Sequence, residues 1–245
     1  MKKLLLSFLL LPFLSQAQIV TIDSVKAPAR RPALQKMRSQ KLYSYSLGVK
    51  AFSYEELPQI LNQVNNNNFQ REYVTGFIFK FNDNQISYRV TGNFFSDDVA
   101  FRNDCEECEE AKGKLRDNSL RLGFEKNMVY GTVQPYFGFD LGYRRNSFRG
   151  SSSNASSLNY TNPYDVKTQK NGFSISPMVG IKFNVIDHIT LAAESSLDLL
   201  YSYEKQERSF KDGNHTRTVN NYKKWEFLLR PIGLLSLQYN FAEQY

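Results

Sequence analysis

Residues 173–183 read FSISPMVGIKF, and the pattern in this stretch decides the fold class. Its odd-numbered positions carry Phe, Ile, Pro, Val, Ile and Phe, whereas its even-numbered positions carry Ser, Ser, Met, Gly and Lys. Alternation of this kind indicates a β-strand whose two faces meet different surroundings. A helix would instead repeat its apolar residues every three or four positions.

The same period of two recurs along the chain on both sides of this stretch. Across the eight segments one face carries no charged residue, while the opposite face carries nine. In the last segment Gly233 falls on the uncharged face and Ile232 on the opposite face. Tyr and Phe are abundant, which also favours strands over helices. The seven other segments are 43–51, 73–81, 86–94, 120–124, 133–143, 189–201 and 227–241.

The connections between the predicted strands alternate in length. Short turns are expected at 82–85, 126–131 and 186–188, all at one end of an up-and-down meander. Long polar loops are expected at the other end, as in barrels that span an outer membrane. These loops are 55–70, 96–118, 149–170 and 204–221.

The bulk of the two faces predicts which of them points outward. A soluble, lipocalin-like barrel would turn its apolar face inward, but an eight-stranded barrel is only wide enough for side chains to fill it. The uncharged face carries Tyr, Phe and Leu at most positions, whereas the other face is rich in Gly, Ser and Thr. Among structures built of strands, only a closed barrel satisfies all backbone hydrogen bonds in lipid. The sequence therefore predicts an all-β, eight-stranded, antiparallel up-and-down transmembrane β-barrel over 42–245.

The N-terminal segment has the features of an export signal. Two lysines precede an apolar run at 4–14, and small residues occupy the cleavage-defining positions that follow. This pattern predicts a signal peptide over 1–17. Residues 18–41 have no clear period and are expected to form a flexible periplasmic leader. No later stretch approaches the roughly 20 apolar residues of a membrane helix.

The final segment, 234–241, reads LLSLQYNF and ends its alternation in an aromatic residue. With the meander and the Ser-Gln-Ala-Gln cleavage region, it makes the chain resemble small eight-stranded outer-membrane barrels of the OmpA membrane-domain and OmpX type, and the Bacteroidota outer-membrane β-barrel group. The resemblance implies a porin-like cell-envelope protein in a Gram-negative outer membrane, in contact with lipid and lipopolysaccharide. It also implies insertion by the barrel-insertion machinery, although residues 242–244 separate Phe241 from the C-terminal Tyr245.

The charged residues of the predicted lumen are the first candidate site. Six are cations and three are acids, and buried charges are costly unless they are paired. A salt-bridged plug is therefore predicted, with a proton or solute path as the alternative. Glu125, Arg144 and Glu226 are expected near the lumen ends. The nine lumen residues are Lys50, Lys80, Arg89, Arg121, Asp140, Lys182, Glu194, Asp198 and Arg230.

Cys105 and Cys108 form a Cys-Glu-Glu-Cys motif in the second predicted loop. In an exported protein two such cysteines are expected to form a disulfide. Metal binding with the neighbouring glutamates and free or redox-active thiols are the alternatives. A four-ligand zinc site would need further Cys or His residues nearby, so no metal is expected.

Function is weakly marked in the sequence. The only histidines are His188, at a short turn, and His215, in a polar loop. Neither forms a recognisable catalytic group, and no cofactor is expected. Basic residues are scattered, which argues against nucleic-acid binding. The leading hypothesis is a non-enzymatic barrel with a structural or contact role for its four surface loops. The alternatives are a lipid-modifying deacylase or acyltransferase and a narrow pore.

Overall fold

The computed structural model of the 245-residue chain describes six ranges of residues. The chain divides into a unit at 1–39 and a unit at 40–245, and the described residues all belong to the second. The predicted signal peptide, the leader, both cysteines and His215 lie outside them. The described ranges are 42–60, 69–83, 85–102, 109–154, 164–210 and 216–243.

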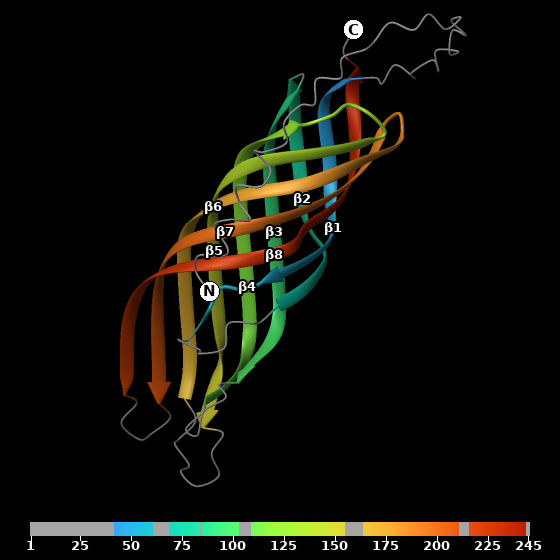
Figure 1. Ribbon diagram of the computed structural model, residues 1–245. Helices are drawn as coiled ribbons and strands as arrows, with labels where there is room; N and C mark the ends of the chain where they lie inside the picture. The colour runs from blue at the N-terminus through green and yellow to red at the C-terminus, as the bar shows by residue number, and fades with distance from the viewer. Residues whose placement is uncertain are drawn as a thin grey trace, which may run out of the picture. The chain divides into compact units, whose positions relative to one another are not determined.

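Eight strands make up this unit (Figure 1). Each strand pairs antiparallel with the next, and β8 pairs with β1 to close the ring. The predicted all-β up-and-down barrel is therefore confirmed. Across the described ranges, no helix is long and apolar enough to span a membrane. The strands are β1 Tyr43–Glu56, β2 Phe69–Asp83, β3 Ile86–Arg102, β4 Glu109–Asn127, β5 Val133–Asn154, β6 Tyr164–Ile186, β7 Ile189–Phe210 and β8 Arg217–Glu243.

The strands are tilted because the ring closes with a stagger. Following paired residues from Val49 through β2 and onward around the ring leads to Trp225 on β8. The direct β8 partner of Val49 is instead Leu237. Such an offset in register is what inclines strands to a barrel axis, and Figure 1 shows the inclination.

The expected long loops at 96–118, 149–170 and 204–221 are mostly strand. β3 and β4 stay paired out to Arg102 and Glu110, and the next two hairpins extend in the same way. The loop prediction was therefore wrong in extent. Outward-facing positions in these parts are polar, which hides the period of two from a search for apolar residues. The tight turns predicted between β2 and β3 and between β6 and β7 are confirmed.

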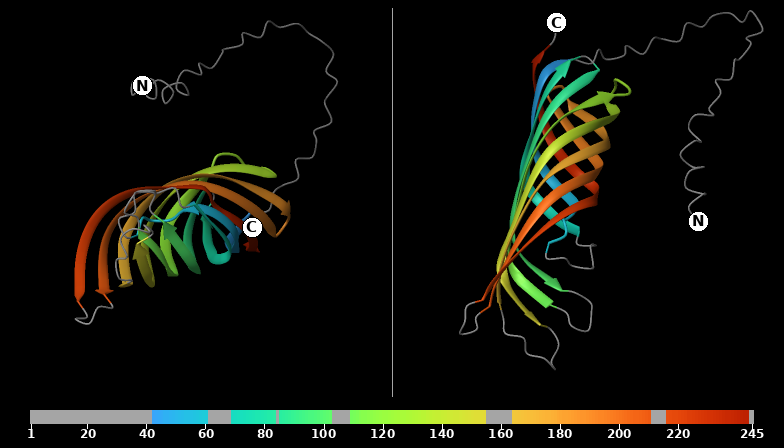
Figure 2. Two further views of the ribbon diagram at one scale, coloured as in Figure 1. Left: turned by 90° about the horizontal axis from the view of Figure 1, so that it is seen from below. Right: turned by 90° about the vertical axis from the view of Figure 1, so that its left-hand side faces the viewer.

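The ring is fully paired only near the short turns. β1 pairs with β8 as far as Tyr54, and β2 pairs with β3 only from Gly76 onward. Beyond these points, β3 to β8 continue as one curved sheet, which Figure 2 shows from two sides.

Residues 57–60, just after β1, lie against the inner face of this sheet. Leu57 and Ile60 belong to a buried cluster with Phe95, Ala111, Leu115, Phe148, Tyr164 and Val166.

The outer surface is apolar over the closed part of the barrel. Phe79, Leu122 and Val179 are among many large apolar side chains that remain exposed on it. The predicted phase breaks in β2 and in β8. Val74, predicted to face inward, is 72% exposed, and in β8 Ile232 points outward whereas Gly233 is buried. Register shifts after Lys50 and after Glu194 accompany these breaks. A bulge adds one unpaired residue to a strand, so the residues that follow it point to the opposite face from the one that strict alternation predicts.

Candidate functional site

The structure brings all nine predicted lumen residues to the inside of the barrel. None is more than 7% exposed. They do not form one group, however, because they divide between two clusters at different heights. Residues that were not assigned to the network in advance complete both clusters.

The cluster nearer the short turns is organised around Arg89. Its guanidinium donates to Asp140 at 2.7 and 3.0 Å and to Glu194 at 2.5 and 2.9 Å. A further hydrogen bond of 3.3 Å reaches Glu125. Bidentate hydrogen bonds between arginine and a carboxylate are stronger and more directional than hydrogen bonds between neutral groups. Arg89 therefore ties β3 to β4, β5 and β7 through the centre of the barrel.

Glu125 completes this turn-side cluster from β4. Its carboxylate accepts hydrogen bonds of 2.8 and 2.9 Å from Lys80 and forms an ion pair with Lys182. The hydroxyl of Tyr136 donates to Glu194 at 3.1 Å, and the ammonium of Lys182 lies 4.9 Å from the centre of the tyrosine ring. The turn-side cluster therefore holds three cations and three carboxylates. Its members are Lys80, Arg89, Glu125, Asp140, Lys182 and Glu194.

A second cluster lies toward the extended hairpins. Arg121 donates to Asp198 at 2.8 Å, and Lys50 donates to Glu55 at 3.0 Å. Ion pairs also join Arg144 to Asp117 and Arg230 to Glu55, while the ammonium of Lys50 lies 3.6 Å from Glu72. This hairpin-side cluster holds four cations and four carboxylates. Its members are Lys50, Glu55, Glu72, Asp117, Arg121, Arg144, Asp198 and Arg230.

Sequence reasoning missed three of the acids that neutralise the cations, namely Glu55, Glu72 and Asp117. Asp117 shares the inward face with Arg121, and the period of two would have found it had the strand been extended into the expected loop. Glu72 similarly continues the face of Lys80. Glu55 could not be found in this way, because the irregularity after Lys50 moves it to the inner face.

A third group of hydrogen bonds and ion pairs holds residues 57–60 against the inner wall of the barrel. The backbone N–H of Gln59 donates to Glu226 at 2.9 Å, and its carbonyl accepts from Lys170 at 2.7 Å. Lys170 and Glu226 also form an ion pair, and Lys224 donates to the Gln59 side chain at 3.2 Å. Residues 57–60 are therefore held across the interior by β6 and β8. Leu57 and Ile60 add apolar contacts with the inner wall.

A polar pocket of about 80 Å³ opens at the short-turn end. Lys80 and Lys182 line it together with amide and hydroxyl groups from several strands. His188 lies at the same end, where its Nδ1 is 2.9 Å from the carbonyl oxygen of Asn240 and its ring contacts Tyr43. No group of three His, Cys, Asp or Glu residues suited to a metal occurs within the described ranges. The disulfide between the two cysteines stays a prediction.

No family model and no curated protein matches this sequence. Solved structures that resemble it include Ail, the attachment invasion locus protein of Yersinia pestis, at 12% identity and a TM-score of 0.38 over 82% of this chain and all of Ail. Outer membrane protein W of E. coli matches at 11% identity and a TM-score of 0.39, over 81% of this chain and 98% of that protein. At these values the likeness transfers neither a function nor a partner.

Proposed function

We propose that the chain is a Gram-negative outer-membrane barrel with a closed lumen and a non-enzymatic contact role for its extended hairpins. The observation that carries this proposal is the contrast between the two faces of the closed ring. Large apolar side chains cover the outside, whereas paired charges fill the inside. Contact with water would be unfavourable for this apolar surface, whereas contact with the acyl chains of lipid would not.

Aromatic residues bound the apolar surface at both ends, as they do in barrels that sit in a bilayer. Near the short turns, Tyr45 contacts both Phe81 and Phe241. On the hairpin side, Tyr143 contacts Phe173, and Tyr201 contacts Trp225. Phe173 and Tyr201 are register partners, so these four side chains form one continuous outer aromatic row.

The arrangement of the chain supports one orientation in the membrane. Tyr43, at the start of β1, pairs with Glu243, at the end of β8, on the short-turn side. With a signal peptide at 1–17, this side faces the periplasm together with the leader at 18–41. The four hairpins then point away from the cell. The barrel-insertion machinery and the surrounding lipid and lipopolysaccharide are the expected partners.

Charge balance supports a closed lumen. The two interior clusters together contain seven cations and seven carboxylates. Opposite charges a few ångströms apart attract strongly where water is scarce. An ion-selective pore would instead present an excess of one sign. Tyr136 adds bulk within the turn-side cluster, and the segment around Gln59 adds bulk elsewhere in the interior.

Two measurements on the refolded protein and one on cells test the proposal. Unboiled protein should migrate faster than boiled protein in detergent gels, and planar-bilayer recordings should show no stable conductance steps. Mass spectrometry should find the same lipid A in cells with and without the protein. Boiling-independent migration would refute the barrel, regular steps would favour the pore, and an altered lipid A would favour the enzyme.

A further inference from the structure

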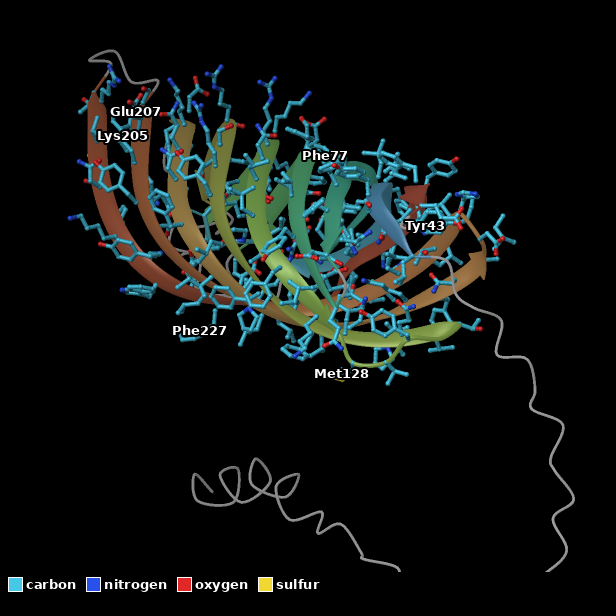
Figure 3. All side chains as sticks on the ribbon, turned by 90° about the horizontal axis from the view of Figure 1, so that it is seen from above. Tyr43, Phe77, Met128, Lys205, Glu207 and Phe227 are labelled. Atoms are coloured by element: carbon cyan, nitrogen blue, oxygen red, sulfur yellow. The ribbon has the colours of Figure 1, made fainter. Side chains whose placement is uncertain are left out.

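The polar pocket at the short-turn end is lined by cations and neutral polar groups. Two ammonium groups line it, those of Lys80 on β2 and Lys182 on β6, which are called the pocket lysines. Hydroxyl and amide groups complete the wall, among them Ser87 on β3 and Gln134 on β5. No Asp or Glu of the described residues lines it. Figure 3 labels Tyr43, which lines the pocket from the start of β1.

The turn-side cluster is neutral as a whole, but its charges are unevenly placed. Arg89 alone makes bidentate hydrogen bonds to two of the three carboxylates. The two pocket lysines share the third carboxylate, that of Glu125. Neither Arg89 nor any of the three carboxylates lines the pocket. The pocket therefore faces two positive charges that have one carboxylate between them.

Both pocket lysines also keep a hydrogen-bond donor available. An ammonium group carries three N–H donors. Lys80 donates two hydrogen bonds, both to Glu125. Lys182 donates to Asn127 at 2.9 Å and makes its ion pair with Glu125. At least one N–H of each ammonium is therefore left over. The hydroxyl of Ser87 likewise has no hydrogen-bond partner among the described residues, although Ser87 is buried.

The geometry points to a binding site for a small free oxyanion, of the phosphate class, inside the short-turn end of the barrel. Two ammonium groups and a hydroxyl can donate to different oxygens of one such ion, and hydrogen bonds from a cation to phosphate are stronger than those between neutral groups. The ion would also offset the positive charge that the pocket lysines share.

The size and position of the pocket fit an ion taken from solution. Its volume of about 80 Å³ is several times the roughly 10–15 Å³ that one water molecule needs, so a group of several atoms has room. The pocket lysines point into the ring, whereas lipid headgroups lie outside it. The site goes beyond the proposed contact role and needs no open path through the barrel.

Gln134→Glu tests the site by placing a carboxylate where the ion would bind. Gln134 is the register partner of Lys182, and directly opposed side chains lie about 5 Å apart at their Cβ atoms. Gln169→Glu is the matched control, because it makes the same change at a half-buried position of β6 that does not line the pocket. Isothermal titration calorimetry on the folded proteins in maltoside micelles, at constant ionic strength, measures the binding of inorganic phosphate, sulfate and chloride.

Wild type and Q169E should bind one phosphate per chain, and sulfate should bind to the same site. Q134E should bind phosphate at least about tenfold more weakly, because the ion would then meet a second negative charge a few ångströms away. Failure of wild type to bind phosphate, or equal affinities of Q134E and Q169E, would overturn the site.

Two further arms define the ligand, and one further variant guards against a folding defect. Chloride that binds as tightly as phosphate would overturn the assignment to an oxyanion. Loss of phosphate binding when phosphatidylglycerol is added to the micelles would overturn the free-ion assignment in favour of a lipid headgroup. K182Q replaces Q134E if unboiled Q134E migrates as unfolded protein. K182Q should show a similar loss because one ammonium group is gone, and an unchanged affinity would overturn the site.

Discussion

Replacing Arg89 with methionine removes the side chain that joins the most carboxylates in the barrel interior. Arg89 donates five hydrogen bonds to Glu125, Asp140 and Glu194 and is only 4% exposed. Its loss leaves three buried carboxylates facing two lysines. Breaking a buried ion pair from one side costs about 3–5 kcal/mol, because the remaining charge stays desolvated. We expect R89M to lower the free energy of unfolding by that amount.

Urea unfolding in lipid vesicles measures the loss. Trp225 is the only tryptophan and lies 63% exposed on the outward face, so its fluorescence reports whether the barrel remains in lipid. Lys126→Met serves as the control for removing an exposed cation, and its effect should stay within about 0.5 kcal/mol. R89M/E194Q leaves two cations and two carboxylates and should recover part of the loss. An R89M effect as small as that of the control would refute the reasoning.

Three further predictions concern single groups. Gly180→Ala should cost about 1–3 kcal/mol, because a Cβ there would lie 2.4 Å from the ring of Tyr136, whereas Gly131→Ala meets no atom closer than 3.8 Å and should be neutral in the same assay. A hydrogen bond from Lys205 holds the pKa of the Glu207 carboxyl below its usual range. This carboxylate therefore stabilises the fold above the unfolded-state pKa of about 4.3 and loses that effect as the pH falls through the folded value; NMR titration should find a higher pKa in Lys205→Gln. Thiol titration of the non-reduced protein should find almost no free thiol at the two cysteines.

The closed part of the barrel was predictable because its two faces differ in both polarity and size. In the stretch 173–183, four of the five inward positions are small, polar or charged, the exception being Met178, and each outward position is apolar. This contrast predicts the strand, its phase and the face that points out of the barrel. The strand count and the tight turns followed from the same signal.

The outer parts of the strands were missed because they leave the apolar surroundings that create the contrast. On β4, outward positions beyond Leu120 carry Lys114 and Arg116, so hydropathy no longer alternates. The backbone pairing continues regardless, since hydrogen bonds between strands do not depend on which solvent the outward side chains meet. An inward pattern of Leu115 and Asp117 remained readable, although polar loops and polar strands look alike on the outward face alone.

The bulges were not predictable, and they decided the membership of the hairpin-side cluster. The irregularity after Lys50 brings Glu55 to the inner face, where it binds both Lys50 and Arg230. A bulge is a local choice of register that satisfies the neighbouring strands, and a single sequence contains no direct record of that choice. The excess of predicted cations over predicted acids was the one indication in the sequence that further acids lie in the interior. Burying six cations with three acids would have left charges unpaired, which demanded further acids nearby.

For an exported outer-membrane barrel, as proposed above, the buried charges would also explain how the chain crosses one membrane and remains in another. A strand that was apolar on both faces would approach the roughly 20-residue hydrophobic run that the inner membrane retains as a helix. Charged residues at alternate positions keep the mean hydropathy at −0.48, although the folded barrel still presents an apolar surface. Those charges must then be buried when the ring closes, at a cost that only near-complete pairing offsets. Equal numbers of cations and carboxylates in both clusters meet this requirement level by level, so pairing inside and lipid contact outside become favourable in the same closed structure.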